Sequence, residues 1–213
     1  MNGIIGRKIG MTQVFDSEGR QVPVTVIEAG PCVVVQRKTR EKDGYDSVQI
    51  GFGDQKEQRL ARPELGHLKK AGVAPVRRLR EFRLDEGEEM NPGDVVGVDV
   101  LEGATHVDVI GVCKGKGFQG VVKRYDMSGG RATHGSGMHR RTGSIGMKVS
   151  PARVFKGKKM PGHTGNVRTT TQNLKVVDIR KDDHVVLVMG AVPGPNGGMV
   201  IVRKAIKKPF EKS

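Results

Sequence analysis

Three groups of residues in the middle of this 213-residue chain have types and spacings that could carry chemistry. The first is the run Gly115-Lys-Gly-Phe-Gln-Gly120, which matches the G-x-G-x-x-G pattern of dinucleotide-binding loops and follows an apolar, strand-like run. Such a loop needs an acidic residue about twenty positions further on to hold the ribose. No carboxylate occurs between Asp126 and Asp178. We therefore interpret the run as a glycine-rich turn whose amides and flanking lysines face phosphate oxygens.

The second group consists of the histidines His134, His139 and His163. A zinc site needs His or Cys clustered at short spacings, and the nearest cysteine in sequence lies 21 residues before His134. The surrounding lysines would also repel a divalent cation. General acid–base catalysis needs positioned carboxylates or a histidine that an acid orients, and this region offers neither. We expect no metal, no cofactor and no catalysis here, and interpret the histidines as groups that stack on nucleotides or hydrogen-bond to them.

The third group is a cluster of basic residues. The chain has 37 Lys and Arg against 23 Asp and Glu, a formal net charge of +14, and a pI near 10.0. Residues 111–175 hold fourteen of the basic residues and a single acid, Asp126, so this segment alone carries +13. The fourteen are Lys114, Lys116, Lys123, Arg124, Arg131, Arg140, Arg141, Lys148, Arg153, Lys156, Lys158, Lys159, Arg168 and Lys175. This concentration of one sign of charge predicts a polyanionic partner, with nucleic acid as the leading class.

Residues 126–165, which we call the arm, have no apolar periodicity of either strand or helix type. They cannot form a core of their own, so we expect the arm to be disordered alone and to become ordered against a partner of opposite charge. The frequent glycines exclude a basic amphipathic membrane helix. An extended backbone with Arg and Lys at short intervals fits the crevices of folded RNA, where arginine binds phosphate bidentately.

The elements that must position these residues are short β-branched runs separated by Gly, Pro, Asp or Asn. They cover residues 11–15, 22–29, 32–38, 46–53, 93–101, 105–113, 174–179, 184–192 and 198–206. This pattern predicts a mainly β fold, a barrel or a sandwich, over residues 1–125 and 166–213, with the arm inserted in it. One short helix is predicted over 63–71, ending at Gly72, and residues 73–89 are expected to cover the barrel surface.

The two cysteines, Cys32 and Cys113, each lie inside an apolar run, which favours buried thiols over a disulfide framework. No apolar run approaches the roughly 18 residues of a membrane span. The N-terminus lacks the apolar stretch and cleavage site of a signal peptide. We therefore expect a soluble, cytoplasmic protein without a membrane partner.

Two stretches closely resemble the bacterial type of the family of the third protein of the large ribosomal subunit. One comprises Leu101, Asp108-Val-Ile-Gly111 and Lys114-Gly-Lys-Gly-Phe-Gln-Gly-Val-Val-Lys-Arg124; the other is HRRTGSIG at 139–146 followed by RVFKGKKMPGHTGN at 153–166. The resemblance extends from the opening GIIGRKIGMTQVF to the closing GGMVIVRKAIKK. The chain departs from the family pattern at Cys113, where Ser or Thr is usual, and at Met147, where some members have a methylated glutamine.

The resemblance implies a translation-protein-like β-barrel with one or two short helices on the surface of the large subunit. It also implies an extension that runs through ribosomal RNA toward the peptidyl-transferase region and a role in early subunit assembly. The implied partners are large-subunit ribosomal RNA and neighbouring ribosomal proteins, without a membrane or a homo-oligomer. The implied RNA-binding residues are Arg7, Lys8, Lys114, Lys116, Lys123, Arg124, Arg131, His134, His139, Arg140, Arg141, Lys148, Arg153, Lys156, Lys158, Lys159, His163 and Arg168.

Two alternatives remain at this point. A nucleic-acid-processing enzyme or translation factor on a similar barrel would need a catalytic carboxylate pair or a nucleotide-binding loop. A DNA-compacting protein would bind duplex DNA as well as folded RNA, and the arm offers no helix to read a groove.

Overall fold

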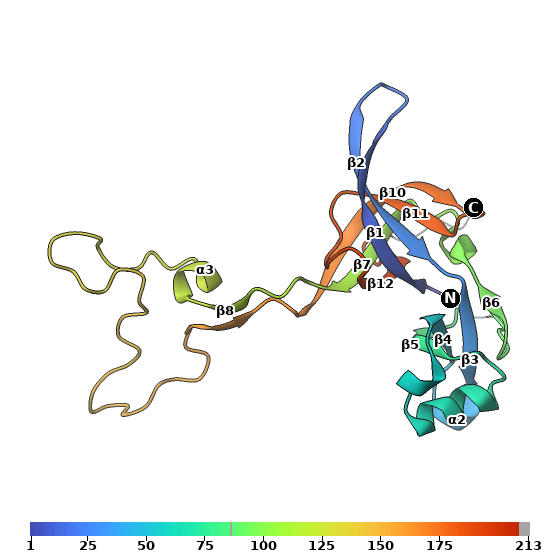
Figure 1. Cartoon of the computed structure of the whole chain (residues 1–213), viewed down its shortest axis with the longest axis horizontal. Coiled ribbons are helices and arrows are strands. Elements are labelled where there is room, and N and C mark those ends of the chain that lie inside the picture. Colours follow the sequence, from blue (N-terminus) through green and yellow to red (C-terminus); the bar gives the residue numbers. More distant parts are fainter. Residues whose placement is uncertain (86, 209–213) are drawn as a thin grey trace. The chain divides into compact units, whose positions relative to one another are not determined.

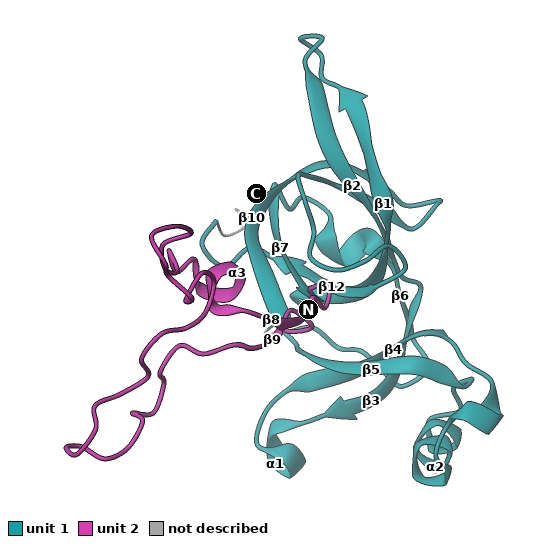
Figure 2. Ribbon diagram, turned by 60° about the vertical axis from the view of Figure 1, so that its left-hand side comes forward, with its two compact units in different colours: residues 1–112, 168–213 teal, residues 113–167 magenta. Residues whose placement is uncertain are grey.

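The computed structural model describes residues 1–85 and 87–208 and confirms the mainly β fold (Figure 1). The chain divides into two compact units (Figure 2). Unit 1 contains residues 1–112 together with the segment that begins at Arg168, and unit 2 contains residues 113–167.

Six strands of unit 1 form a closed barrel in the order β1-β12-β7-β10-β11-β2, with every neighbouring pair antiparallel. Their bounds are β1 Gly3–Phe15, β2 Gln21–Ala29, β7 His106–Val112, β10 Arg168–Arg180, β11 Val185–Met189 and β12 Met199–Lys204. The β-branched residues that favour these strands also fill the centre, where Ile4, Val109 and Val202 are fully buried. The barrel predicted from the sequence is therefore confirmed.

A second sheet of four strands, in the order β5-β4-β3-β6, packs beside the barrel. Its strands are β3 Cys32–Lys38, β4 Ser47–Asp54, β5 Val76–Arg83 and β6 Val95–Val96. One hydrophobic core joins the two sheets, since Ile5 of the barrel and Val34, Ile50 and Phe82 of the second sheet belong to the same buried cluster. The pattern of the sequence did not predict this second sheet.

Two predictions for the second sheet were wrong in detail. Residues 73–89 contain the strand β5, which pairs with β4 along its whole length rather than only covering the barrel. The strand predicted over 93–101 is limited to the two residues of β6, and the 3₁₀ helix η2 (Val98–Leu101) follows it. Val98 and Leu101 are buried in the shared core, so a short helical turn buries the apolar residues that suggested a strand.

Three short α-helices are present among the described residues, one more than the upper number predicted: α1 (Arg40–Asp43), α2 (Arg62–Lys70) and α3 (Val121–Tyr125). A 3₁₀ helix, η1 (Glu57–Arg59), precedes α2. The helix predicted over 63–71 is confirmed as α2. Its first turn is closed by the Glu64 carboxylate, which accepts a hydrogen bond from the Ala61 backbone N–H at 3.2 Å, and Leu68 is its buried residue.

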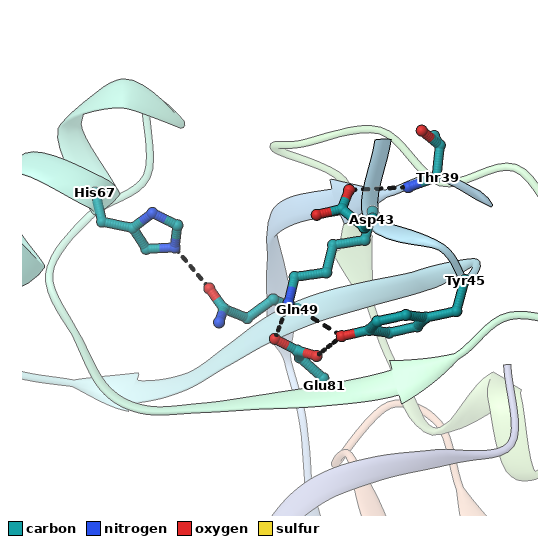
Figure 3. Close-up of polar contacts among 7 residues, drawn as sticks. Thr39, Asp43, Tyr45, Gln49, His67 and Glu81 are labelled. Carbon is teal, nitrogen blue, oxygen red and sulfur yellow. Dashed lines mark hydrogen bonds and ion pairs between the residues drawn. The ribbon is translucent and has the colours of Figure 1, made fainter. Parts of the chain in front are cut away.

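A polar cluster holds the second sheet together at the surface (Figure 3). Lys38 Nζ on β3 donates to Glu81 Oε1 on β5 at 2.7 Å, and the Tyr45 hydroxyl donates to Glu81 Oε2 at 3.0 Å. The hydrogen bond from Lys38 is the main reason why the pKa of Glu81 lies below its ordinary value. Gln49 of β4 pairs with Glu81, and its Oε1 lies 2.6 Å from Nε2 of His67 on α2.

Both cysteines are thiols rather than halves of a disulfide, as predicted. Cys32 is buried where the barrel meets the second sheet, and burial raises the pKa of its thiol to about 12. Cys113 is half-buried.

Unit 2 begins with β8 (Gly117–Gln119) and α3 and ends with β9 (Gly162–Thr164), which pairs with β8. Residues 126–161 lie between α3 and β9 and form no helix or strand, in agreement with the pattern of the sequence. Unit 2 (residues 113–167) covers more of the sequence than the predicted arm (residues 126–165), because the segment before the arm pairs with the segment at its end. The expectation that the arm is disordered in the free protein stays a prediction.

Candidate nucleic-acid interface

Unit 2 carries twelve Lys and Arg and one acid, Asp126. Eleven of the twelve basic side chains are exposed, and Arg124 is half-buried. Among the residues that the structure describes, no carboxylate lies within ion-pair distance of any of the twelve. Because like charges at this density repel one another, the surface is suited to a partner that supplies many negative charges.

The base of unit 2 is a short antiparallel ladder. Gly117, Phe118 and Gln119 of β8 pair with Thr164, His163 and Gly162 of β9, and the Lys116 backbone N–H donates to Thr164 O at 2.9 Å. Gly165 has φ +78°, and a Cβ there would lie 2.3 Å from Lys114 O. Only glycine fits this contact. The ladder therefore holds Lys114, Lys116 and His163 on two adjacent segments, all with exposed side chains.

Helix α3 is tied to the far end of the arm by Arg124. Its Nη1 donates to Met160 O at 2.8 Å, and its guanidinium carbon Cζ lies over the Tyr125 ring, 5.0 Å from the centroid. Lys159 Nζ lies over the same ring at 5.6 Å. A Cβ at Gly162 would lie 2.5 Å from Arg124 Nη1, so the small residue makes room for the guanidinium. Arg124, predicted to bind RNA, thus already has a structural contact, while the neighbouring Lys123 is exposed.

Backbone hydrogen bonds between residues of the arm fold part of it back on itself. The Gly130 N–H donates to His139 O at 2.6 Å, and the Arg141 N–H donates to Met138 O at 2.8 Å. His134 and His139 both have left-handed backbone conformations, with φ of 57° and 40°. Their side chains are exposed. The predicted basic residues of this segment are exposed as well; they are Arg131, Arg140, Arg141, Lys148, Arg153, Lys156, Lys158 and Lys159.

Exposed apolar side chains accompany the charges, and they were not among the predicted site residues. Phe118 is 75% exposed, Met147 74%, Val149 81% and Phe155 59%. The Arg153 guanidinium lies 6.0 Å from the Phe155 ring centroid. Aromatic and arginine planes that remain open to solvent can stack on unpaired bases. The sequence did contain a signal for them: Phe118 and Phe155 each lie in a run rich in Gly and Lys, and such a run cannot be buried in a core.

The three predicted residues of unit 1 behave differently from one another. Arg168 begins β10 and is exposed. Arg7 is exposed, but its Nη2 donates to Glu28 Oε2 at 2.6 Å. Lys8 is only 7% exposed, and its Nζ donates to Val192 O at 2.8 Å and to Gly194 O at 3.4 Å. These carbonyls accept hydrogen bonds from the buried ammonium and give Lys8 a structural role, while RNA binding by Lys8 stays a prediction.

Metal, nucleotide and membrane sites find no support in the part of the chain that the structure describes. No group of three His, Cys, Asp or Glu side chains that could hold a metal ion occurs there. The glycine-rich run forms the antiparallel strand β8 and is followed by the five-residue helix α3, which is not the parallel strand–helix–strand unit of a dinucleotide site. None of the helices in residues 1–85 and 87–208 has the length and apolar character of a membrane span.

Comparison with known proteins gives consistent matches over nearly the whole chain. A family model described as Ribosomal protein L3 matches residues 87–185. The chain is 54% identical over 205 residues to the large ribosomal subunit protein uL3 of Heliobacterium modesticaldum, covering 96% of this chain and 97% of that protein. It is 49% identical over 205 residues to uL3 of Geobacter sulfurreducens, covering 96% and 98%. With uL3 of Brachyspira pilosicoli it shares 49% identity over 212 residues, covering 100% and 97%.

Proposed function

Because this chain belongs to the ribosomal protein L3 family and is thus a structural constituent of the large ribosomal subunit, we propose that it binds large-subunit ribosomal RNA chiefly through unit 2. Membership also places it in the cytoplasm, within the ribosome, and sets aside the enzyme and DNA-compacting alternatives.

The observation that supports the proposal is the set of eleven exposed basic side chains of unit 2, none within ion-pair distance of a described carboxylate. Phosphate groups of RNA supply the missing negative charge, and their condensed counterions are released on binding. Arg131, Arg140, Arg141 and Arg153 have planar forks that bind phosphate through two hydrogen bonds. The exposed Phe118 and Phe155 add surfaces on which unpaired bases stack.

The glycines and turns of the arm suit it to follow an irregular RNA surface. Residues 126–161 contain no helix or strand, so their backbone can adapt to the partner as it becomes ordered. We carry over from the family resemblance that the arm runs toward the peptidyl-transferase region and supports early subunit assembly. Neighbouring ribosomal proteins are the remaining partners in this proposal, with no homo-oligomer.

Ultraviolet cross-linking of assembled subunits tests the proposal. Large subunits that contain this chain are irradiated, digested with nuclease and trypsin, and analysed by mass spectrometry for peptides that retain a nucleotide. We expect cross-linked peptides from residues 113–168, including those with Phe118 or Phe155. If other ribosomal proteins of the same sample give cross-links while no peptide of unit 2 does, unit 2 is not the RNA-binding element.

A further inference from the structure

Lys8 is a buried cation of the barrel whose hydrogen-bond partners lie far from it in the sequence. It follows Ile4 and Gly6 on β1, and all three residues are buried, because alternate residues of a strand point to the same side. Its Nζ donates to Val192 O at 2.8 Å and to Gly194 O at 3.4 Å. Both acceptors belong to residues 190–198, the β11–β12 loop, which joins β11 to β12. The ammonium therefore ties β1 to this loop.

The backbone and the side chain of Lys8 hold different parts of the loop. The Lys8 N–H donates to Gly198 O at 2.9 Å, and the Lys8 carbonyl accepts from the Gly197 N–H at 2.7 Å, which fixes the end of the loop. The ammonium fixes the middle of the loop, and its hydrogen bond to Val192 O is buried. An apolar residue in place of Lys8 would take this donor away from Val192 O, and a buried acceptor without its donor is unfavourable. The middle of the loop thus depends on the side chain of Lys8.

The middle of the loop packs against the last two residues of β7. A Cβ at Gly194, where φ is +101°, would lie 2.9 Å from Val112 O, and a Cβ at Gly111 would lie 2.9 Å from Pro193 O. Contacts this close leave no room for a side chain, so both positions require glycine. A loop that stays in place therefore restricts the positions that Gly111 and Val112 can occupy.

Val112 is also the residue at which the chain leaves the barrel (Figure 2). Unit 2 begins at Cys113, and the chain returns to the barrel at Arg168, which pairs with Val112 where β10 lies beside β7. The Cys113 N–H donates to Val167 O at 3.0 Å and joins the outgoing and the returning segment. We call Val112, Cys113, Val167 and Arg168 the root of unit 2. The loop that Lys8 holds contacts this root at Val112.

We propose that Lys8 is a positioning residue for RNA binding by unit 2 and acts on the root through the β11–β12 loop. The proposal rests on the function proposed above for unit 2. When the root is ordered before binding, less conformational freedom is lost as the cations of unit 2 meet RNA phosphates, and binding is tighter. If loss of the ammonium leaves the root ordered for about one fifth of the time, the affinity falls about fivefold.

Two variants release the loop from opposite sides. Lys8→Met removes the ammonium and keeps an unbranched side chain. Gly194→Ala leaves Lys8 and every charge in place, but its Cβ would press against Val112 O, and a φ of +101° is unfavourable for alanine. If Lys8→Met does not fold, Gly194→Ala still tests whether the loop holds the root.

The first measurement is amide hydrogen exchange in the free, full chain by NMR. In both variants we expect the Cys113 amide, which donates to Val167 O, to exchange about tenfold faster, because the root opens more often. Amides of β4, the strand between β3 and β5, should keep their exchange rates. The second measurement is filter binding to large-subunit ribosomal RNA at physiological salt. Both variants should bind about fivefold more weakly than the original chain.

Lys69→Met is the matched control. Lys69 is an exposed lysine of α2, a helix that packs on the second sheet through Leu68, so this variant removes the same charge away from the β11–β12 loop. It should leave the exchange rate of the Cys113 amide and the affinity for RNA within about twofold. Thermal melts verify that each variant is folded.

The proposal is overturned if the Cys113 amide exchanges at its original rate in the folded variants, since the loop would then not hold the root. It is also overturned if Lys8→Met weakens RNA binding while Gly194→Ala does not, which would show that Lys8 contacts RNA itself. The function proposed for unit 2 fails separately, if a chain whose arm lysines and arginines are replaced by Gln binds RNA as tightly as the original chain. In that case the exchange rate of Cys113 still decides whether Lys8 orders the root.

Discussion

Excising the arm while keeping its base tests whether the charges of unit 2 are the RNA-binding element. Residues 129–159 are removed, and Ser128 is joined to Met160 by about six Gly and Ser residues, which span up to about 20 Å. The contacts that define the base are kept: the β8–β9 ladder, the Arg124 hydrogen bond to Met160 O, and Gly165 against Lys114. Eight basic residues are lost: Arg131, Arg140, Arg141, Lys148, Arg153, Lys156, Lys158 and Lys159.

The magnitude follows from the exposed charges. Of the eleven exposed basic residues of unit 2, three remain after excision: Lys114, Lys116 and Lys123. Each phosphate contact contributes about 0.9 to the slope of log affinity against log salt on duplex nucleic acid and about 0.7 on single strands. If all eleven make contacts, the slope is about −8 to −10, and it falls to about −2 to −3 in the excised chain. A roughly threefold to fourfold reduction is expected for any uniform fraction of contacts.

Unit 1 should remain folded after the excision. Shortening the connection changes the loop-closure free energy by only about 0.6 kcal/mol per halving of its length. The core that joins the barrel and the second sheet contains no residue of the excised range. We therefore expect a cooperative thermal melt close to that of the full chain, whereas subunits assembled with the excised chain should be defective in assembly or in peptide-bond formation.

The assay is filter binding to large-subunit ribosomal RNA between 50 and 300 mM salt, with thermal melts followed by circular dichroism. A matched control keeps the full arm but replaces the same eight basic residues with Gln. Both variants should show the reduced slope, because charge and not chain length carries the effect. An unchanged slope in either variant would refute the electrostatic reasoning. Loss of the cooperative melt in the excised chain would show that the arm is needed for the fold of unit 1.

Three further predictions use simpler measurements. Trypsin should cut the free protein first at Arg140, Arg141, Lys156, Lys158 and Lys159, and these sites should be protected in assembled subunits; equal resistance in both states contradicts ordering on binding. At pH 8, maleimide should label Cys113 and leave Cys32 unmodified, because a thiol with a pKa of about 12 is about one part in 10⁴ thiolate, and unfolding should expose both. Glu81→Gln should lower the melting temperature at pH 7, since the lowered pKa of Glu81 means that its contact with Lys38 stabilises the fold above the unfolded pKa of about 4.3. This difference should vanish as pH falls through the folded pKa, and Glu57→Gln, at an exposed glutamate without an ion pair to any described residue, should show no such dependence.

The sequence alone identified the arm, because local net charge and the absence of apolar periodicity can be read along the chain without knowing any contact. The short β-branched runs predicted the barrel strands for a similarly local reason: alternation and turn residues are visible in a few residues. Strand β5 could not be predicted in this way. Its apolar residues Val76, Leu79 and Phe82 recur every third position among arginines, and only pairing with β4 and packing on two different cores makes this pattern a strand.

Which cations are available to a partner depends on contacts between residues far apart in the chain. Lys8 follows Ile4 and Gly6 at strand spacing, so alternation could have placed it on the buried face, but the carbonyls that accept hydrogen bonds from its ammonium belong to Val192 and Gly194. Arg124 is engaged in the same way by Met160 O, whereas Arg77 and Arg78 lie in the nearly neutral part of the chain and have no carboxylate partner among the described residues. Counting charge therefore overestimates the number of cations available to a partner, because Lys8 and Arg124 are already engaged by backbone carbonyls. The arm can be recognised from composition because its charge and its lack of apolar periodicity are properties of the sequence alone, while the engagement of Lys8 and Arg124 depends on contacts that only the fold creates.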